Sequence, residues 1–183
     1  MKTMEKKPWS GRFKENTDKF FEDFSESISF DYRLAPYEIK ASLVYAEALK
    51  EANILTEEEL NLIKKGLKEI EEEIKSGKFV FSKSYEDVHM NIEKALYEKI
   101  GEVAYKLHTG RSRNEQVITD LRLYLMDEVE NLKKELKALL ESIIAKAEKY
   151  YGVIIPGFTH LQHAQPVLFS HGLWHIMKCS NTI

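Results

Sequence analysis

The segment Thr109–Asn114, with the sequence TGRSRN, has the residue types of an anion-binding site. Gly110 interrupts the preceding element, and a long helical pattern follows it directly. The first N–H groups of a helix are free to donate, and the helix dipole adds about half a positive charge there. Arg111 and Arg113 can each hold a carboxylate through two parallel hydrogen bonds. The segment therefore predicts a site for the carboxylates of a small anion, unless both arginines point to solvent or pair with acidic residues elsewhere.

A second segment, Pro156–His163, has the sequence PGFTHLQH. His160 follows the hydroxyl of Thr159 between loop-forming residues, and a histidine in such a place suits acid–base work near neutral pH. The alternative is a histidine that only makes structural hydrogen bonds. His160 and His163 are three residues apart, but no cysteine or carboxylate stands nearby and a closed zinc site needs four ligands. We therefore expect no metal here.

A third segment, Tyr85–Glu93, opens a predicted helix with acidic residues, which interact favourably with the helix dipole. His89, Asn91 and Glu93 could line a polar cleft. On their own they are weak evidence for a site.

Apolar residues recur mostly at intervals of three and four, so the chain is predicted to be mainly α-helical. The predicted helices cover residues 18–25, 34–52, 57–76, 86–100 and 111–151. The residues up to Thr17 are expected to form an extended arm, those after Pro156 a polar loop, and Val167–Trp174 a further helix. We expect an amino-terminal helical domain over residues 1–109 and the first part of a central helical bundle over residues 110–183.

The predicted helix over residues 111–151 contains neither glycine nor proline. Its apolar residues form a stripe of the kind found at the seam of a helical bundle. The stripe consists of Ile118, Leu121, Leu125, Val129, Leu132, Leu136, Leu139 and Ile143. No other predicted helix is much longer than half of this one. The partner helices must therefore come from other subunits, or from a part of the protein that is missing here.

The composition excludes several classes of protein. The 183 residues include 43% hydrophobic and 31% charged residues, which is typical of a folded domain. A formal net charge of −3 gives no global field that would recruit nucleic acid or an anionic membrane. A single cysteine excludes a disulfide framework, and there is neither a secretory signal nor a long apolar run. We therefore expect a cytoplasmic protein.

In this order and spacing, the segments resemble the argininosuccinate lyase family of the fumarase/aspartase superfamily. The matching segments are Trp9–Phe13, Ser25–Ile28, Glu86–His89, Lys106–Leu125 and Pro156–His171. They span essentially all of residues 8–171, and the run 106–125 is the most specific. Adenylosuccinate lyase and fumarase share the architecture but not these sequence motifs, whereas the delta-crystallins of the lens share the motifs closely. Residues from about Gly172 onward fit the family poorly.

The resemblance implies a fumarase/aspartase-like helical subunit of a homotetramer, with active sites where three subunits meet. It implies reversible cleavage of argininosuccinate to arginine and fumarate without a metal or an organic cofactor. A base would remove the proton beside one carboxylate, and the Cα–N bond would then break. The developing carbanion needs fixed donors aimed at it, and the leaving guanidine group must be protonated.

The resemblance also assigns roles to residues. Three positions correspond to substrate-binding residues: Ser27, Asn114 and Thr159. Three positions at the helix start would hold the succinyl carboxylates: Arg111, Ser112 and Arg113. His160 corresponds to the catalytic histidine of the family, and His89 and His108 are expected to line the cleft.

Two departures from the family pattern are mild, since Ala41 replaces a usual glycine and Glu115 a usual aspartate. The second catalytic residue of the family is a serine in a G-S-S-x-M-P-x-K-x-N-P loop, which this sequence does not contain. We therefore expect an amino-terminal fragment that is inactive on its own. The alternatives are a structural protein of the same fold, as in the lens, or a lyase of a sibling substrate such as adenylosuccinate.

Overall fold

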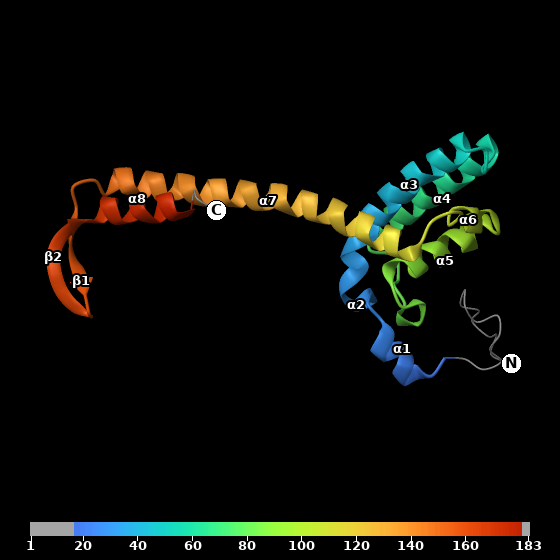
Figure 1. Cartoon of the computed structure of the whole chain (residues 1–183), viewed down its shortest axis with the longest axis horizontal. Helices are drawn as coiled ribbons and strands as arrows, with labels where there is room; N and C mark the ends of the chain where they lie inside the picture. The colour runs from blue at the N-terminus through green and yellow to red at the C-terminus, as the bar shows by residue number, and fades with distance from the viewer. Residues whose placement is uncertain (1–16, 181–183) are drawn as a thin grey trace. The chain divides into compact units, whose positions relative to one another are not determined.

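The computed structural model describes residues 17–180, which are mostly helical with one two-stranded sheet (Figure 1). The elements are α1 (Lys19–Ser25), α2 (Ile28–Asp31), η2 (Tyr32–Leu34), α3 (Ala35–Glu51), α4 (Glu57–Lys75), η3 (Lys83–Tyr85), α5 (Val88–Ile100), α6 (Val103–Lys106), α7 (Arg113–Lys149), β1 (Ile154–Thr159), β2 (Gln162–Leu168) and α8 (Phe169–Ser180). The predicted mainly α class is confirmed. The predicted arm up to Thr17 lies almost wholly outside the described residues. None of the described helices is long and apolar enough to cross a membrane.

The chain forms two compact units, one up to Tyr124 and one from Leu125 onward. Helix α7 contributes its first residues to one unit and the rest to the other. The domain boundary that we expected, between residues 109 and 110, lies just before α7 begins and stays a prediction.

The core of the first unit lies between α3, α4 and α5. Its fully buried side chains include Ile39, Ile63, Leu67, Ile70 and Leu96. At Gly66 of α4, an added Cβ would come within 2.7 Å of the Leu96 side chain. The absence of a side chain at this position therefore lets α4 approach α5 closely.

The helix boundaries follow from caps that the sequence contains. A capping box begins α4, because Thr56 Oγ1 accepts from the Glu59 N–H at 3.2 Å while Glu59 Oε2 accepts from the Thr56 N–H at 3.1 Å. Asp18 and Asp87 cap α1 and α5 through the N–H groups of Phe20 and Met90. A cap of this kind is worth about 1 kcal/mol. These local signals explain why the helices begin close to the predicted positions.

The predicted polar loop after Pro156 is wrong, because these residues form an antiparallel hairpin of β1 and β2. Pro156 lies opposite Pro166, and each strand of a two-stranded sheet is an edge strand, where a missing N–H is tolerated. Gly157 sits at a bulge, where an added Cβ would come within 2.8 Å of the carbonyl oxygen of Gln165. The two prolines suggested a loop, although an isolated hairpin accepts them.

The turn of the hairpin consists of His160 and Leu161, with φ values of 49° and 63°. Two-residue turns with positive φ usually contain asparagine or glycine, so the sequence gives no hairpin signal here. The second error in this region follows from the first. Val167 and Leu168 belong to β2, and the predicted helix over residues 167–174 instead spans Phe169–Ser180.

Candidate functional site

The start of α7 is capped by its own residues. Ser112 Oγ accepts from the Asn114 N–H at 3.2 Å, and Glu115 Oε2 accepts from the Ser112 N–H at 2.9 Å. This reciprocal pair has the form of a capping box. Glu115, where the family usually has aspartate, makes one of the two bonds. We call residues Arg111–Asn114 the helix-start segment, and part of its donor capacity is used within the chain.

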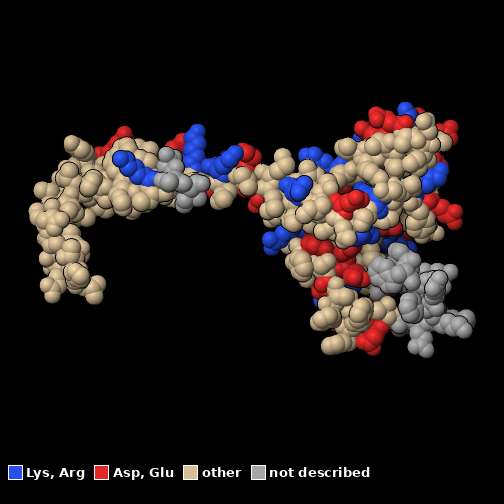
Figure 2. Space-filling model, in the orientation of Figure 1, with Lys and Arg blue, Asp and Glu red and all other residues tan. Residues whose placement is uncertain are grey.

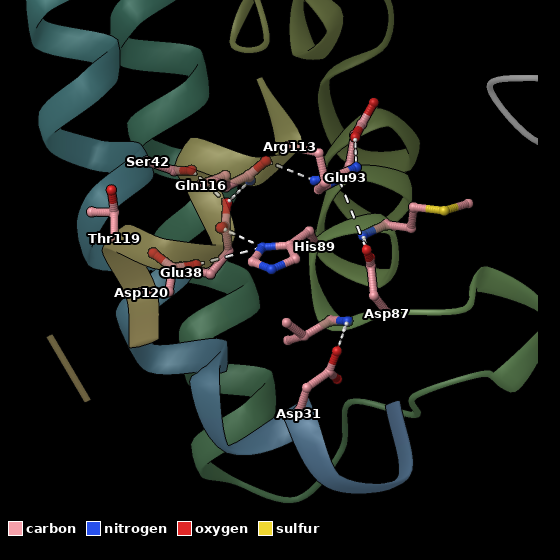
Figure 3. A network of polar contacts seen from close by, with 12 residues as sticks. Asp31, Glu38, Ser42, Asp87, His89, Glu93, Arg113, Gln116, Thr119 and Asp120 are labelled. Atoms are coloured by element: carbon pink, nitrogen blue, oxygen red, sulfur yellow. Dashed lines mark hydrogen bonds and ion pairs between the residues drawn. The ribbon is translucent and has the colours of Figure 1, made fainter. Parts of the chain in front are cut away.

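Arg113 is engaged through all three of its guanidinium nitrogens (Figure 3). Nη1 donates to Gln116 Oε1 at 2.7 Å, and Nη2 donates to Glu93 Oε2 at 3.0 Å. Nε lies 3.8 Å from Asp87 Oδ2. Arg113 therefore ties the start of α7 to α5, and a carboxylate that binds it must compete with Glu93.

Arg111 is held differently, because it makes no ion pair within the part of the chain that the structure describes. Its guanidinium carbon lies 4.7 Å from the centre of the Tyr45 ring, and Nη2 lies 3.4 Å from Ser42 Oγ. The Tyr45 hydroxyl in turn donates to the carbonyl oxygen of Thr109 at 2.7 Å. The Nε of Arg111 is buried without a hydrogen-bond partner. Of the two arginines, Arg111 is therefore the one with uncommitted donors.

A cavity of about 20 Å³ lies beside Arg111 and is large enough for one water molecule. Glu38, His89, His108 and Gln116 also line it. The rest of the lining is largely apolar, with Leu67, Ile92 and Leu96 among its residues.

Glu38 of α3 is the centre of a buried polar cluster (Figure 3). Its Oε1 accepts from Ser42 Oγ at 2.7 Å and from Gln116 Nε2 at 2.6 Å. Its Oε2 lies 2.8 Å from His89 Nδ1. Burial alone would raise the pKa of Glu38, but the hydrogen bonds, with that of His89 the largest, lower it to about 2. Glu38 is therefore a carboxylate at neutral pH.

Asp120 of α7 is fully buried in the same cluster, and both of its carboxyl oxygens lack a hydrogen-bond donor among the described residues. Its Oδ2 lies 3.5 Å from His89 Nδ1. Burial, followed by the neighbouring Glu38, raises the pKa of Asp120 to about 9. Asp120 is therefore a neutral acid at neutral pH. One oxygen or nitrogen from each of Glu38, His89 and Asp120 lies within 4.8 Å of the others, a spacing that could also hold a metal ion.

The remaining predicted residues lie in different surroundings. Ser27, at the start of α2, donates to Asp31 Oδ2 at 2.6 Å, and burial raises the pKa of Asp31. Asn114 is exposed beside the cap of α7. Thr159 and His160 lie in the second unit, at the end of β1 and in the hairpin turn, and both are exposed. The predicted site residues are therefore divided between the two units.

Sequence reasoning missed four buried polar residues of the first unit: Glu38, Ser42, Gln116 and Asp120. A signal for the first two was present, since they occupy the face of α3 that otherwise buries Ala35, Ile39, Ala46 and Leu49. Polar side chains on an apolar helical face need buried partners. Glu38 and Ser42 are four residues apart, and so are Gln116 and Asp120 on α7.

A family model described as a lyase matches residues 11–180. The chain belongs to this lyase family. The match includes the residues after Gly172, which we expected to fit poorly. The curated argininosuccinate lyases of Sulfurihydrogenibium sp. (strain YO3AOP1) and Hydrogenobaculum sp. (strain Y04AAS1) are 53% and 54% identical to it over 167 residues, or 91% of the chain. The chain spans about 36% of the length of these two lyases. The resemblance to argininosuccinate lyases is confirmed.

Solved structures show that the lyase family members share this fold. EDDS lyase in complex with formate is 26% identical, with a TM-score of 0.71 over 89% of this chain and 31% of that one. A fumarate lyase:delta crystallin from Brucella melitensis is 18% identical, with a TM-score of 0.70 over 86% of this chain and 41% of that one. The fumarase/aspartase-like fold predicted from the motifs is confirmed.

Proposed function

We propose that this chain forms part of an argininosuccinate lyase, which cleaves argininosuccinate reversibly to arginine and fumarate in arginine biosynthesis. The observation that carries the proposal is the identity of 53–54% to argininosuccinate lyases over 91% of the chain. The identity to EDDS lyase, which has the same fold, is only about half as high. No metal or organic cofactor is part of the proposal.

The helix-start segment would hold the carboxylates of the succinyl group. Arg111 is the better candidate for direct contact, since among the described residues its guanidinium has no carboxylate partner and its Nε has no acceptor. Ser112 and Asn114 lie on the same exposed turn, and Arg113 fixes that turn against α5. Ser27 and Thr159 would complete substrate binding, and His89 and His108 would line the cleft.

The reaction requires a base to remove the proton beside one carboxylate and an acid to protonate the leaving guanidine group. We assign one of these proton transfers to His160, which is exposed at the tip of the hairpin. The helix dipole and the guanidinium of Arg111 would stabilise the negative charge that develops on the carboxylate. The other proton transfer falls to a residue outside these 183 positions.

We also propose that the working enzyme is a cytoplasmic homotetramer. The apolar stripe of α7 is exposed in the second unit, where Leu125, Val129, Leu132 and Leu139 are each about half exposed or more. The hairpin contains no lysine, arginine, aspartate or glutamate, and Figure 2 shows it without a blue or red atom. Uncharged, exposed apolar surface of this extent suits contacts with other subunits.

A chimera tests the proposed activity. The chain would be followed by the remaining sequence of the Sulfurihydrogenibium lyase, and fumarate formation would be measured by absorbance with argininosuccinate and adenylosuccinate side by side. We expect turnover of argininosuccinate by the chimera and none by the 183 residues alone. Substitution His160→Asn in the chimera should lower kcat by at least about 100-fold, a typical contribution of general acid–base catalysis.

Three results would contradict the proposal. Turnover of adenylosuccinate alone would assign a sibling reaction. A folded tetrameric chimera without turnover would favour a structural protein of the same fold. Full activity of the 183 residues alone would show that the proposed division of the site is wrong.

A further inference from the structure

The two arginines of the helix-start segment are both linked to a single buried oxygen, Glu38 Oε1. Figure 3 shows the link from Arg113 through Gln116 to Glu38. Ser42 Oγ donates to this oxygen at 2.7 Å and lies 3.4 Å from Arg111 Nη2. Gln116 Nε2 donates to it at 2.6 Å, and the other end of the same amide accepts from Arg113 Nη1 at 2.7 Å. Both linking side chains are buried, so the place of Glu38 helps to determine where the two guanidinium groups lie.

The second oxygen of Glu38 faces His89 Nδ1, which can donate a hydrogen bond to only one of the two carboxyl groups beside it. His89 Nδ1 lies 2.8 Å from Glu38 Oε2 and 3.5 Å from Asp120 Oδ2. One ring nitrogen carries at most one hydrogen, and the shorter distance gives it to Glu38. No other donor among the described residues reaches the Asp120 oxygens, which are fully buried. A second carboxylate at this depth would have no hydrogen-bond donor among the described residues, so Asp120 needs a proton of its own.

We propose that Glu38 is a positioning residue for the helix-start segment, and that a proton carried by the neighbouring Asp120 carboxyl group keeps it in place. This inference deepens the proposed function, on which its catalytic meaning rests, because the positioned segment is the one assigned to the substrate carboxylates. The opposite pKa directions of the two groups agree with it, since Asp120 is the acid form and Glu38 the carboxylate at neutral pH.

The titratable and charged groups that act on this proton are Glu38 of α3, His89 of α5, and Arg111 and Arg113 at the start of α7. The two arginines favour the ionised form of Asp120, whereas burial and Glu38 favour the acid form, and the acid form prevails.

A divalent cation is the competing occupant, since a histidine and two carboxylates are ligands that Zn²⁺ accepts. Two observations favour the proton. Glu38 Oε1 is already occupied by two donors, and the guanidinium groups of Arg111 and Arg113 add positive charge nearby. A proton on Asp120 adds one positive charge to the cluster, whereas a divalent cation adds two.

NMR spectroscopy on the 183-residue chain tests the inference without substrate. We expect the carboxyl carbon of Asp120 to stay in the acid form at pH 7 and to titrate near pH 9. Below that pH, the side-chain amide of Gln116 should exchange its hydrogens slowly and the Arg113 guanidinium should rotate slowly. Both should become at least about tenfold faster once Asp120 ionises.

Three variants separate positioning from stability. Asp120→Asn replaces the acid O–H by an amide donor, so Gln116 and Arg113 should stay slow and lose their pH dependence. Asp120→Ala removes the donor, and both rates should rise at least about tenfold at a temperature where the chain is still folded. The control Asp127→Asn alters an exposed carboxylate of the same helix and should leave both rates unchanged.

The inference is overturned if Asp120 titrates below pH 5, or if Asp120→Asn loosens Arg113 as much as the alanine variant should. It is also overturned if stoichiometric Zn²⁺ shifts the His89 ring signals with micromolar affinity, which would assign the cluster to a metal. Because Asp120→Asn is nearly isosteric, it keeps the test valid if the alanine variant does not fold. All readouts are independent of turnover, so a failure of the proposed lyase activity remains distinguishable.

Discussion

The helix-start segment and the hairpin turn carry the two halves of the proposed chemistry, and they differ in how they are held. The helix-start segment rests on buried hydrogen bonds from α3 and α5. His160 and Leu161 in the hairpin turn are exposed, Leu161 to 98%, and both have positive φ. One region is therefore preorganised within this chain, whereas the other would gain its surroundings from additional protein.

Among the substitutions that test this difference, Glu38→Ala should have the largest effect on the free energy of unfolding. The substitution leaves the buried donors of Ser42, Gln116 and His89 without their acceptor, so the free energy of unfolding should fall by about 3 kcal/mol. Urea denaturation of the first unit measures this. The matched variant Glu47→Ala removes an exposed carboxylate of the same helix and should leave the free energy of unfolding nearly unchanged. Equal losses in the two variants would mean that the buried cluster does not organise the unit.

Gly157→Ala should act on the hairpin alone. The new Cβ would meet the carbonyl oxygen of Gln165 at 2.8 Å, so pairing of β1 with β2 should weaken by about 2 kcal/mol. Hydrogen exchange should show loss of protection in the hairpin amides, with the first unit unchanged. Loss of protection in α3 or α5 as well would show that the two regions are not independent.

The pH dependence of stability should belong to the first unit. The pKa of Asp120 is raised to about 9 in the folded chain, so the folded state binds more protons than the unfolded state between about pH 4 and pH 9. The free energy of unfolding should therefore fall as the pH rises through this window, by about 1.4 kcal/mol per pH unit for a full proton difference.

Glu38, with its pKa lowered to about 2, contributes the opposite slope, so its stabilisation is lost as the pH falls from about 4 toward 2. Denaturation midpoints from pH 2 to pH 9 should reveal both slopes. Asp120→Asn should remove only the fall in stability above about pH 4. If the variant keeps that fall, another group causes it.

The smallest effect should come from Leu161→Gly in the turn. Leucine at φ 63° is strained, and its side chain is exposed, so glycine relieves strain without losing contacts. The hairpin should gain about 1 kcal/mol, seen as roughly fivefold slower exchange of its amides. Faster exchange would indicate that Leu161 makes contacts that stabilise the turn.

The same contrast explains what the sequence could predict. The Thr56 capping box, Pro36 in the first turn of α3 and the positive-φ Gly77 and Gly101 are local signals, and the helices they bound were predicted. The hairpin was missed because its turn lacks asparagine and glycine and its strands contain Pro156 and Pro166.

The buried cluster was missed for a different reason. Glu38, Gln116 and Asp120 meet from α3 and α7, and nothing local indicates that polar residues so far apart in the sequence share one site. The motif predicted that Arg111 and Arg113 both bind anions. Only the tertiary structure shows that Arg113 is paired with Glu93, whereas Arg111 keeps an unsatisfied donor.

The central claim, that the helix-start segment holds substrate carboxylates, is tested most directly by the fumarate affinity of the chimera. Arg111→Ala should weaken fumarate binding at least about tenfold, which corresponds to about 1.4 kcal/mol, while the buried cluster keeps the fold. Arg113→Ala should weaken it too, with an additional loss of stability because the tie to Glu93 is broken. Unchanged fumarate affinity in Arg111→Ala would contradict the account.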